Sequence, residues 1–348
     1  MDNQFTEFQD SFNSPLKQSE YFEKKPKINT RLGLLVFHDS GNYPDSSFPV
    51  GEISETISLP LAGTLDSKYE PIGEDEISFK TITPMFEKTS TQVGVPEMKF
   101  YEKIMKQGRK FFLKKHMDKH IKTLKMYVEN MKAMALTGLV YSYYKTNEGE
   151  IKGKAEYDVS SAITSVSQST FGIDFSTGTT TRMQIFAAYE KQRKLRNKAT
   201  GLFNSPEDCI ILASDEQYTY LGDILDVAAS DNKDVSSIER NYLKLKGYKI
   251  YNEEGAYKKP VLNKTTGKYV MTEYTAIAAK ETMMIDVTNG GNKFRYLDVA
   301  DFEENSTGKD YFLLMVLKAD KSGADIYFRS VPLAIINGYT ICKITTQA

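Results

Sequence analysis

Histidine supplies many of the general bases and metal ligands in proteins, and this chain has three histidines, His38, His116 and His120. His116 and His120 are four residues apart, so they would share one face of a helix. A zinc protease of the H-E-x-x-H type needs a glutamate directly after the first histidine, and Met117 occupies that position. We therefore interpret the pair, which lies among lysines, as part of a solvated helix face.

Two short turns, Thr265–Lys268 and Ser306–Lys309, look like fragments of phosphate-binding loops. Each lacks the upstream glycine and the following serine or threonine that would hold phosphate and magnesium. The sequence has no G-x-S-x-G elbow and no cysteine metal cluster. Its two cysteines, Cys209 and Cys342, lie in apolar stretches typical of buried thiols in a reducing compartment, although the sequence leaves a disulfide open. We therefore expect a protein that is not an enzyme and that binds no cofactor or metal ion.

Basic side chains crowd one short stretch of the chain, where Asp118 is the lone acid. They are Lys106, Arg109, Lys110, Lys114, Lys115, Lys119, Lys122 and Lys125. One interpretation is a solvated helix face that keeps the surface soluble. The other is a surface that faces a polyanion through salt-sensitive phosphate contacts that are indifferent to sequence. A second basic group, Arg193, Lys194, Arg196 and Lys198, could join that surface, but neither group has the pattern of a specific nucleic-acid reader.

The element that must position these lysines is a long helix, predicted from Tyr101 to Thr137. Apolar residues recur along it in steps of three and four from Leu113 to Ala135, which is the spacing of one helical stripe. Neither proline nor glycine interrupts it between Gly108 and Gly138, so at 1.5 Å per residue it would span roughly 40 Å. Gly138 is placed to end the helix in the left-handed conformation that glycine adopts at little cost.

Composition limits the class of protein. The chain has 348 residues, of which 40% are hydrophobic, so it can bury a core in one large domain or in two or three interleaved ones. The formal net charge of -1 gives no global nucleic-acid signature. The N-terminus lacks the basic and apolar regions of a secretory signal, and no run approaches the ~18 apolar residues of a membrane span.

The segment before the long helix is predicted to be extended. Residues 1–44 show no sustained period and are interpreted as an extended arm, with a disordered tail as the alternative. Two β-prone runs, Ile53–Leu61 and Ile77–Val93, flank a polar stretch that contains Gly63, Pro71 and Gly73. A hairpin of this length is marginal in water unless something covers it, so we predict that it lies on another chain, with folding back on its own domain as the alternative.

After the long helix, strands and helices alternate without a βαβ rhythm, which indicates the α+β class. We expect a hairpin of Leu139–Lys145 and Ala155–Val159, a boundary rich in serine, threonine and glycine at Ser160–Thr181, and a helix at Arg182–Lys198. A buried strand at Asp208–Ala213 then precedes a helix capped by Ser214. Loop and a short helix are expected at 231–243, and strands at 248–252, 268–275, 275–279, 282–287, 311–317, 325–330, 332–336 and 339–345.

Several of these segments resemble a known family. Ala135–Gly138 closing the helix, the strand that follows it, and Tyr157-Asp158 resemble the segment after the spine helix in the lambda-type major capsid protein (phage capsid protein E) family. Phe294–Val299 resembles that family's late aromatic and acidic segment, and Ser330–Leu333 resembles its ending. The order and spacing match over residues 53–348. Val159 and Leu297 depart from the pattern, because the family usually has glycine at both positions.

The resemblance implies the HK-ninety-seven capsid fold, which tailed-phage shells share with bacterial encapsulins. In its terms, residues 1–44 are the N-arm and residues 45–96 are the extended E-loop. Residues 97–181 and 298–331 form the peripheral (P) domain with its spine helix. Residues 182–297 and 332–348 form the axial (A) domain.

The resemblance also implies a function. It predicts the major capsid protein of a tailed bacteriophage or prophage, which forms hexamers and pentamers of an icosahedral shell around double-stranded DNA. Portal, scaffold and decoration proteins would be further partners, and assembly would occur in the bacterial host cytoplasm without a membrane. The residues expected to face the lumen or DNA are Lys110, Lys114, Lys115, Lys119 and Lys122, and the hairpin with Gly63, Pro71 and Gly73 would join subunits.

Two alternatives remain. A nanocompartment shell of the encapsulin type would use the same fold to enclose a cargo enzyme. A nucleic-acid-binding protein that does not assemble would use the same lysines as a small oligomer.

Overall fold

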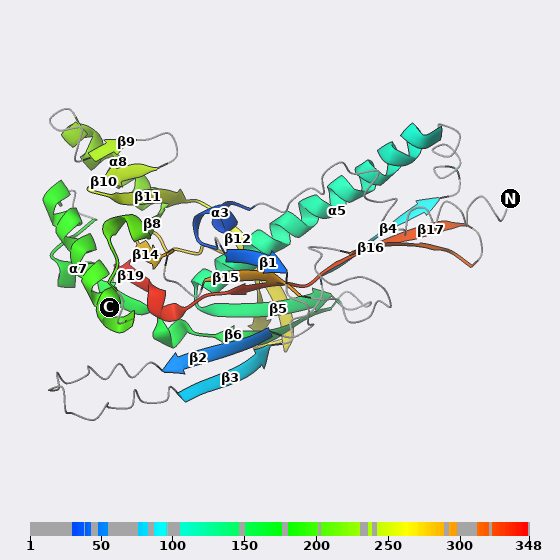
Figure 1. Ribbon diagram of the computed structural model, residues 1–348, viewed down its shortest axis with the longest axis horizontal. Coiled ribbons are helices and arrows are strands. Elements are labelled where there is room, and N and C mark those ends of the chain that lie inside the picture. The colour runs from blue at the N-terminus through cyan, green and yellow to red at the C-terminus, as the bar shows by residue number, and fades with distance from the viewer. Residues whose placement is uncertain are drawn as a thin grey trace, which may run out of the picture.

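A computed structural model provides the structure of the chain. It describes residues 30–37, 39–42, 48–54, 76–82, 87–94, 96, 105–145, 150–175, 180–200, 203–229, 236–238, 242–288, 292–297, 312–319 and 322–346. In parts of some helices and strands, this description covers the backbone alone. The elements are those of an α+β protein (Figure 1).

The longest helix among the described residues, α5, runs from Met105 to Leu136, which confirms the prediction from sequence. It ends in a turn in which the Gly138 N–H donates to the Ala135 carbonyl at 2.8 Å. Gly138 has φ +84, and a Cβ atom there would lie 2.6 Å from the Cα atom of Ser160. Glycine is therefore required both by the backbone conformation and by the close approach of the next element.

Packing around α5 changes along its length. Ile121, Leu124 and Val128 are buried, as the apolar stripe predicts, whereas the side chains of Leu113 and Met117 lie outside the described residues. From Asn130 to Leu136 every residue is buried, so the helix runs into the core at its C-terminal end.

Strands from both ends of the chain cover this buried part of α5. The three-stranded sheet has the order β1 (Asp39–Asn42), β15 (Lys293–Tyr296), β18 (Pro332–Ile335), with β1 parallel to β15. The short helix α3 (Arg31–Leu35) precedes β1 and contacts α5. The sequence predicted only an extended arm here, because a five-residue helix is too short to show a period.

The β-prone segment before α5 divides into two separate sheets. β2 (Phe48–Ser54) and β3 (Glu76–Ile82) form an antiparallel pair. The first strand begins earlier than the predicted run Ile53–Leu61 and shares only Ile53 and Ser54 with it, whereas residues 55–61 lie outside the described residues. The run Ile77–Val93 is not one strand, however, because β4 (Glu87–Gly94) pairs with β17 (Gly323–Ser330). Pro84 falls between them and cannot donate to a ladder. β16 (Phe312–Leu317) completes this second sheet, whereas Gly63, Pro71 and Gly73 lie outside the described residues.

The hairpin after α5 is confirmed as β5 (Leu139–Lys145) and β6 (Ile151–Asp158). It belongs to a four-stranded sheet of order β12-β13-β6-β5, with β12 at Tyr257–Asn263 and β13 at Lys268–Tyr274. The sequence missed β12 because Pro260 argues against a central strand, but β12 is an edge strand, where proline is tolerated. The strand predicted at 275–279 is wrong, since these residues form an irregular segment of bends that leads into a turn.

A seven-stranded sheet forms the other end of the molecule, where helices α7 (Arg182–Thr200) and α8 (Asp215–Ala229) pack on it (Figure 1). Both helices confirm the sequence predictions, and Ser214 caps α8, with its Oγ accepting from the Gln217 N–H at 3.4 Å. The sheet order is β7 (Thr164–Ser167), β19 (Ile341–Thr345), β14 (Thr282–Asp286), β8 (Cys209–Ser214), β11 (Tyr248–Glu253), β10 (Leu243–Leu245) and β9 (Ser236–Ile238).

One expectation for this sheet is wrong, and a second segment contains a strand that the sequence did not predict. Within the stretch expected to be loop and short helix, residues 236–238 form β9, which extends the sheet edge. The stretch Ser160–Thr181, interpreted as a boundary, contains β7, which pairs in parallel with β19. A short polar strand at a sheet edge has too few apolar residues to show a pattern in the sequence.

The central strand β8 divides the apolar interior into two clusters. Ile210 and Leu212 face the cluster that includes α5, whereas Ile211 and Ala213 face the cluster beneath α7 and α8. All six residues of β8 are buried, which explains why it reads as a continuous apolar run rather than as an alternation. Among the described residues, no helix has an apolar stretch long enough to cross a bilayer.

Candidate functional site

The lysine-rich side of α5 faces away from the core. The side chains of Lys115, Lys119, Lys122 and Lys125 are exposed, on the side of the helix opposite to Ile121, Leu124 and Val128. The side chains of Lys110 and Lys114 lie outside the described residues. The structure therefore places three of the five predicted site lysines on one accessible surface.

The histidine pair contradicts the prediction of a solvated face, because only 6% of His116 and 3% of His120 is exposed. The His120 ring stacks on Phe328 of β17, with centroids 5.4 Å apart, and its Nε2 lies 3.1 Å from Thr91 Oγ1 of β4. Burial lowers the pKa of His120 to about 4, helped by the positive charges of His116 and Lys119. A neutral imidazole therefore packs the sheet of β4 and β17 against α5.

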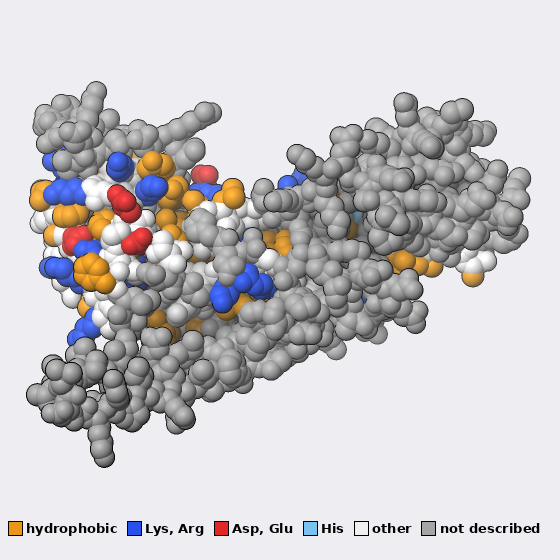
Figure 2. Space-filling view, in the orientation of Figure 1, with side chains coloured by type: hydrophobic (Ala, Val, Ile, Leu, Met, Phe, Trp, Pro, Cys, Tyr) orange, Lys and Arg blue, Asp and Glu red, His pale blue; other side chains and the backbone are white. Residues whose placement is uncertain are grey.

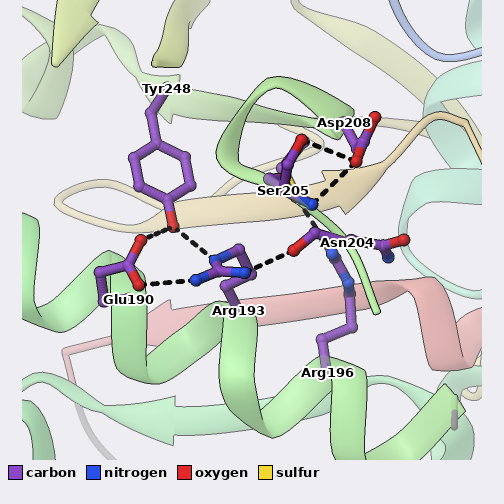
Figure 3. Close-up of polar contacts among 8 residues, drawn as sticks. Glu190, Arg193, Arg196, Asn204, Ser205, Asp208 and Tyr248 are labelled. Atoms are coloured by element: carbon purple, nitrogen blue, oxygen red, sulfur yellow. Dashed lines mark hydrogen bonds and ion pairs between the residues drawn. The ribbon is translucent and has the colours of Figure 1, made fainter. Parts of the chain in front are cut away.

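The basic group on α7 also differs from the expectation, because two of its members turn inward (Figure 3). Arg193 forms an ion pair with Glu190 at 2.7 Å, and its Nε donates to the Tyr248 hydroxyl at 3.1 Å. Tyr248 in turn donates to Glu190 at 2.6 Å. Burial acts to raise the pKa of the Glu190 carboxyl, but the hydrogen bonds from Arg193 and Tyr248 outweigh it and lower that pKa.

Arg196 is fully buried and donates to the Cys209 sulfur at 3.0 Å. Cys209 lies beside the turn of Ser205 and Asp208, in which both the N–H and the hydroxyl of Ser205 donate to the Asp208 carboxylate, at 2.8 and 2.7 Å (Figure 3). Lys194 and Lys198 stay exposed. The group therefore ties α7 to the seven-stranded sheet and does not form a continuous basic patch.

α7 lies at the opposite end of the molecule from the N-terminal half of α5, so the two basic groups do not share a surface (Figure 1). The described part of the face drawn in Figure 2, around α7 and its sheet, mixes basic, acidic and apolar side chains.

The polar contacts continue into the core through Asn204. Its backbone carbonyl accepts from Arg193, and its amide nitrogen donates to Asp286 of β14. Asn292 then donates to the Asp286 carbonyl at 3.0 Å and accepts from the Asn337 N–H at 3.1 Å. This chain of contacts links α7 to the segment that leads into the last strand.

A third cluster holds α3 on α5. Lys132, of which 3% is exposed, donates to Thr30 Oγ1 at 2.8 Å and lies over the Phe294 ring, 4.0 Å from its centroid. Glu129 accepts from the Leu32 N–H at 2.9 Å. Burial lowers the pKa of Lys132 to about 8, although Glu129 partly opposes the shift. The sequence analysis did not single out this lysine. The feature that could have identified it is a charged residue inside the apolar run at the C-terminal end of α5.

The clusters are structural rather than reactive. Within the described ranges, no group of three or more histidine, cysteine, aspartate or glutamate residues could hold a metal ion. Cys209 and Cys342 are free and buried. Burial raises the pKa of both thiols, that of Cys342 to about 12, which suppresses the thiolate that a nucleophile would need.

Comparison with solved structures gives low identities over nearly the full chain. The mature capsid of bacteriophage PhiM1 matches with a TM-score of 0.48 and 9% identity, covering 92% of this chain and 88% of that one. The capsid of an empty GTA particle matches with a TM-score of 0.48 and 9% identity over 93% and 92%. The encapsulin of Synechococcus elongatus matches with a TM-score of 0.45 and 8% identity over 96% and 95%. No curated protein sequence matches the chain.

The sequence-based family comparison is decisive. The family described as phage major capsid protein E matches residues 17–346, which is nearly the whole chain. This confirms the family that the sequence motifs predicted. The chain belongs to the phage major capsid protein E family, and its function is that of a structural capsid protein.

Proposed function

We propose that copies of this chain form the hexamers and pentamers of a closed icosahedral shell that encloses double-stranded DNA. The observation that carries the proposal is the family match over residues 17–346. The polar clusters support it, because they hold the helices and sheets of one subunit together. A shell subunit of this kind acts through its contacts with other copies. Repeated self-complementary or head-to-tail patches are what a closed assembly of identical chains needs.

We also propose the division into N-arm (1–44), E-loop (45–96), peripheral domain (97–181 and 298–331) and axial domain (182–297 and 332–348). Strand pairing supports two refinements of this proposal. Because β7 pairs with β19, we would place residues 164–167 with the axial sheet rather than with the peripheral domain. Because β13 pairs with β6, we would place the hairpin of β12 and β13 with the sheet of β5 and β6 rather than with the axial domain. The free thiols of Cys209 and Cys342 support assembly in the reducing cytoplasm of a bacterial host.

The pair of β2 and β3 would be the clasp between neighbouring subunits. Its two strands form a sheet of their own, without a third hydrogen-bonded strand among the described residues. Two-stranded ribbons are marginal in water by themselves, so a neighbouring subunit that covers this one would stabilise it.

The exposed lysines of α5 would face the lumen and contact DNA phosphates. Changing Lys115, Lys119 and Lys122 together to glutamine should weaken DNA retention and lower the salt dependence of DNA binding by about two to three phosphate contacts. A map of the assembled particle with these side chains on its outer surface would exclude this role.

Electron microscopy of the expressed protein, with phage portal and scaffold proteins supplied, tests the main proposal. We expect megadalton particles, and particles filled during infection should retain DNA after nuclease treatment. Particles that protect a cargo enzyme and no DNA would favour a nanocompartment. A protein that stays a small oligomer by light scattering, yet binds DNA in a salt-dependent way, would contradict the shell.

A further inference from the structure

The hairpin of β12 and β13 carries apolar side chains onto the surface. Val261 and Val270 are direct cross-strand partners, and 40% and 51% of their surfaces are exposed. The adjacent Leu262 is 47% exposed. Among the described residues, β13 pairs with β6 at one position, Tyr269 with Ile151, beside the turn that joins β12 to β13. Cross-strand β-branched pairs stabilise a sheet mainly when something packs on them, which suggests a covering partner.

The end of this hairpin is held by its own hydrogen bonds. The Asn263 carboxamide oxygen accepts from the N–H groups of Thr265 and Thr266, at 2.9 and 3.2 Å. The Gly267 N–H donates to the Asn263 carbonyl at 2.8 Å, with φ +66 at the glycine. A rigid, preorganised tip loses little conformational entropy when it binds a partner.

The outer edge of β12 is not available for strand addition near the core. The carboxamide of Asn130 on α5 takes the place of a neighbouring strand, since its oxygen accepts from the Lys258 N–H at 2.6 Å and its nitrogen donates to the Lys258 carbonyl at 2.5 Å. Two residues later, Pro260 has no N–H to donate. A partner would therefore dock on the side-chain face of the hairpin rather than extend its sheet.

That face is basic. Lys268 is exposed on the same side as the valine pair, because alternate residues of each strand share a face, and Lys264 is exposed in the turn. We define the tip face as Val261, Val270, Lys264 and Lys268.

A surface of opposite charge lies on α8 of the same chain. Glu216 and Asp223 are exposed and seven residues apart, which places them on one side of the helix. We define these two residues as the α8 acidic face. Glu216 also lies 3.5 Å from Lys280 of its own chain, in a solvent-exposed ion pair that holds it only weakly. Figure 1 shows α8 at the far end of the seven-stranded sheet, whereas the hairpin of β12 and β13 lies in the middle of the molecule, so the two faces of one subunit do not meet.

We propose that the tip face docks on the α8 acidic face of a second copy of this chain. The proposal rests on the shell function, which brings many copies together, and it names where two of them touch. Such a contact is head-to-tail, and head-to-tail contacts close into rings when the rotation between copies is a whole fraction of a turn. The valines would supply the dry centre of the contact, and the charges would set its register.

Paired charge reversals in the full-length chain test this contact. One variant carries Lys264→Glu and Lys268→Glu, a second carries Glu216→Lys and Asp223→Lys, and a third carries all four changes. The fraction of protein in megadalton particles, measured by analytical ultracentrifugation, should fall at least about tenfold in the first two variants, because like charges meet across the contact. It should return to within about twofold of the unchanged chain in the third, because the opposite charges meet again.

A matched control reverses two exposed lysines on another hairpin, Lys244→Glu and Lys249→Glu, and should assemble normally. An unchanged melting temperature in every variant would show that each one folds. Zero-length cross-linking of particles made from mixed isotope-labelled chains should join Lys264 or Lys268 to Glu216 or Asp223 of a different copy.

Three outcomes would overturn the contact. Normal assembly of either double variant, or failure of the fourfold variant to recover, would show that these faces do not meet, while the shell function would stand. If the unchanged chain with its partners supplied forms no particles, the shell function fails and the contact fails with it.

Discussion

The ammonium group of Lys132 lies 2.8 Å from the hydroxyl oxygen of Thr30, across 102 positions of sequence. The same hydroxyl accepts from the Gly33 N–H at 3.3 Å and so caps α3. One buried lysine on α5 thereby fixes the point at which the N-terminal segment meets the core of the subunit.

Shortening this lysine should loosen α3. Lys132→Ala removes a buried stem that packs on Phe294 and should lower the free energy of unfolding by about 3 kcal/mol. Lys132→Met keeps the stem and removes a buried charge, so it should cost no more than about 1 kcal/mol. Chemical denaturation and hydrogen exchange of residues 31–37 would measure both. Equal losses in the two variants would show that the ammonium group, and not the stem, holds the helix.

Lys132 should also make stability depend on pH in the alkaline range. Its pKa is about 8 in the folded chain, against 10.5 for an unperturbed lysine side chain, so between these values the unfolded chain binds more protons. Stability therefore rises with pH in this window, by up to about 1.4 kcal/mol per pH unit. Urea denaturation of the unchanged chain and of Lys132→Met from pH 7 to 10 isolates the effect. Parallel curves would contradict it.

His120 should produce the same sign of dependence at acid pH. Its pKa is about 4 in the folded chain, against 6.5 for an unperturbed histidine side chain, so stability is lost as the pH falls from 6.5 to 4. The loss should be on the order of 3 kcal/mol, because the unfolded chain gains a proton that the folded chain cannot hold. His120→Phe keeps a ring beside Phe328 and should flatten this part of the curve. An equally steep loss in that variant would assign the effect to another group.

The sequence predicted those parts of the fold that local patterns determine. α5 followed from the spacing of its apolar residues and from Gly138, and β8 followed from an unbroken apolar run. The burial of His120 could not be predicted in this way, because the residues that bury it, Thr91 and Phe328, come from distant parts of the chain. Periodicity shows that a helix has an apolar side, but not how wide a side its neighbours will cover.

The clusters that involve arginine and lysine were missed for a related reason. A charged residue in a helix is ordinarily solvated, and only the tertiary fold brings Cys209 to Arg196 or Thr30 to Lys132. The family motifs did not depend on these contacts. They identified the capsid protein family from the sequence of short segments, although the sequence does not show which residues those segments contact.

Deleting residues 62–76, the stretch expected to form the end of the E-loop, should leave a folded subunit. It removes little of the described fold, because only Glu76 at the start of β3 belongs to a described strand. Shell closure should fail, since the clasp between subunits is lost. Circular dichroism and electron microscopy would check the two parts of this prediction. Normal shells from the deletion variant would exclude the clasp.

Two glycines with a left-handed backbone conformation allow the cost of that conformation to be measured separately from the cost of a steric clash. Gly138 has φ +84 and Gly172 has φ +70, so alanine at either position should cost about 1 kcal/mol from the left-handed conformation alone. At Gly172 nothing lies within 4 Å of the added carbon, whereas at Gly138 it would meet the Ser160 backbone at 2.6 Å. Gly138→Ala should therefore cost about 3 kcal/mol or more, since α5 must move away from the turn that begins at Ser160. Thermal and urea denaturation of the two variants gives the difference directly, and equal losses would mean that the close approach to Ser160 does not determine how α5 ends.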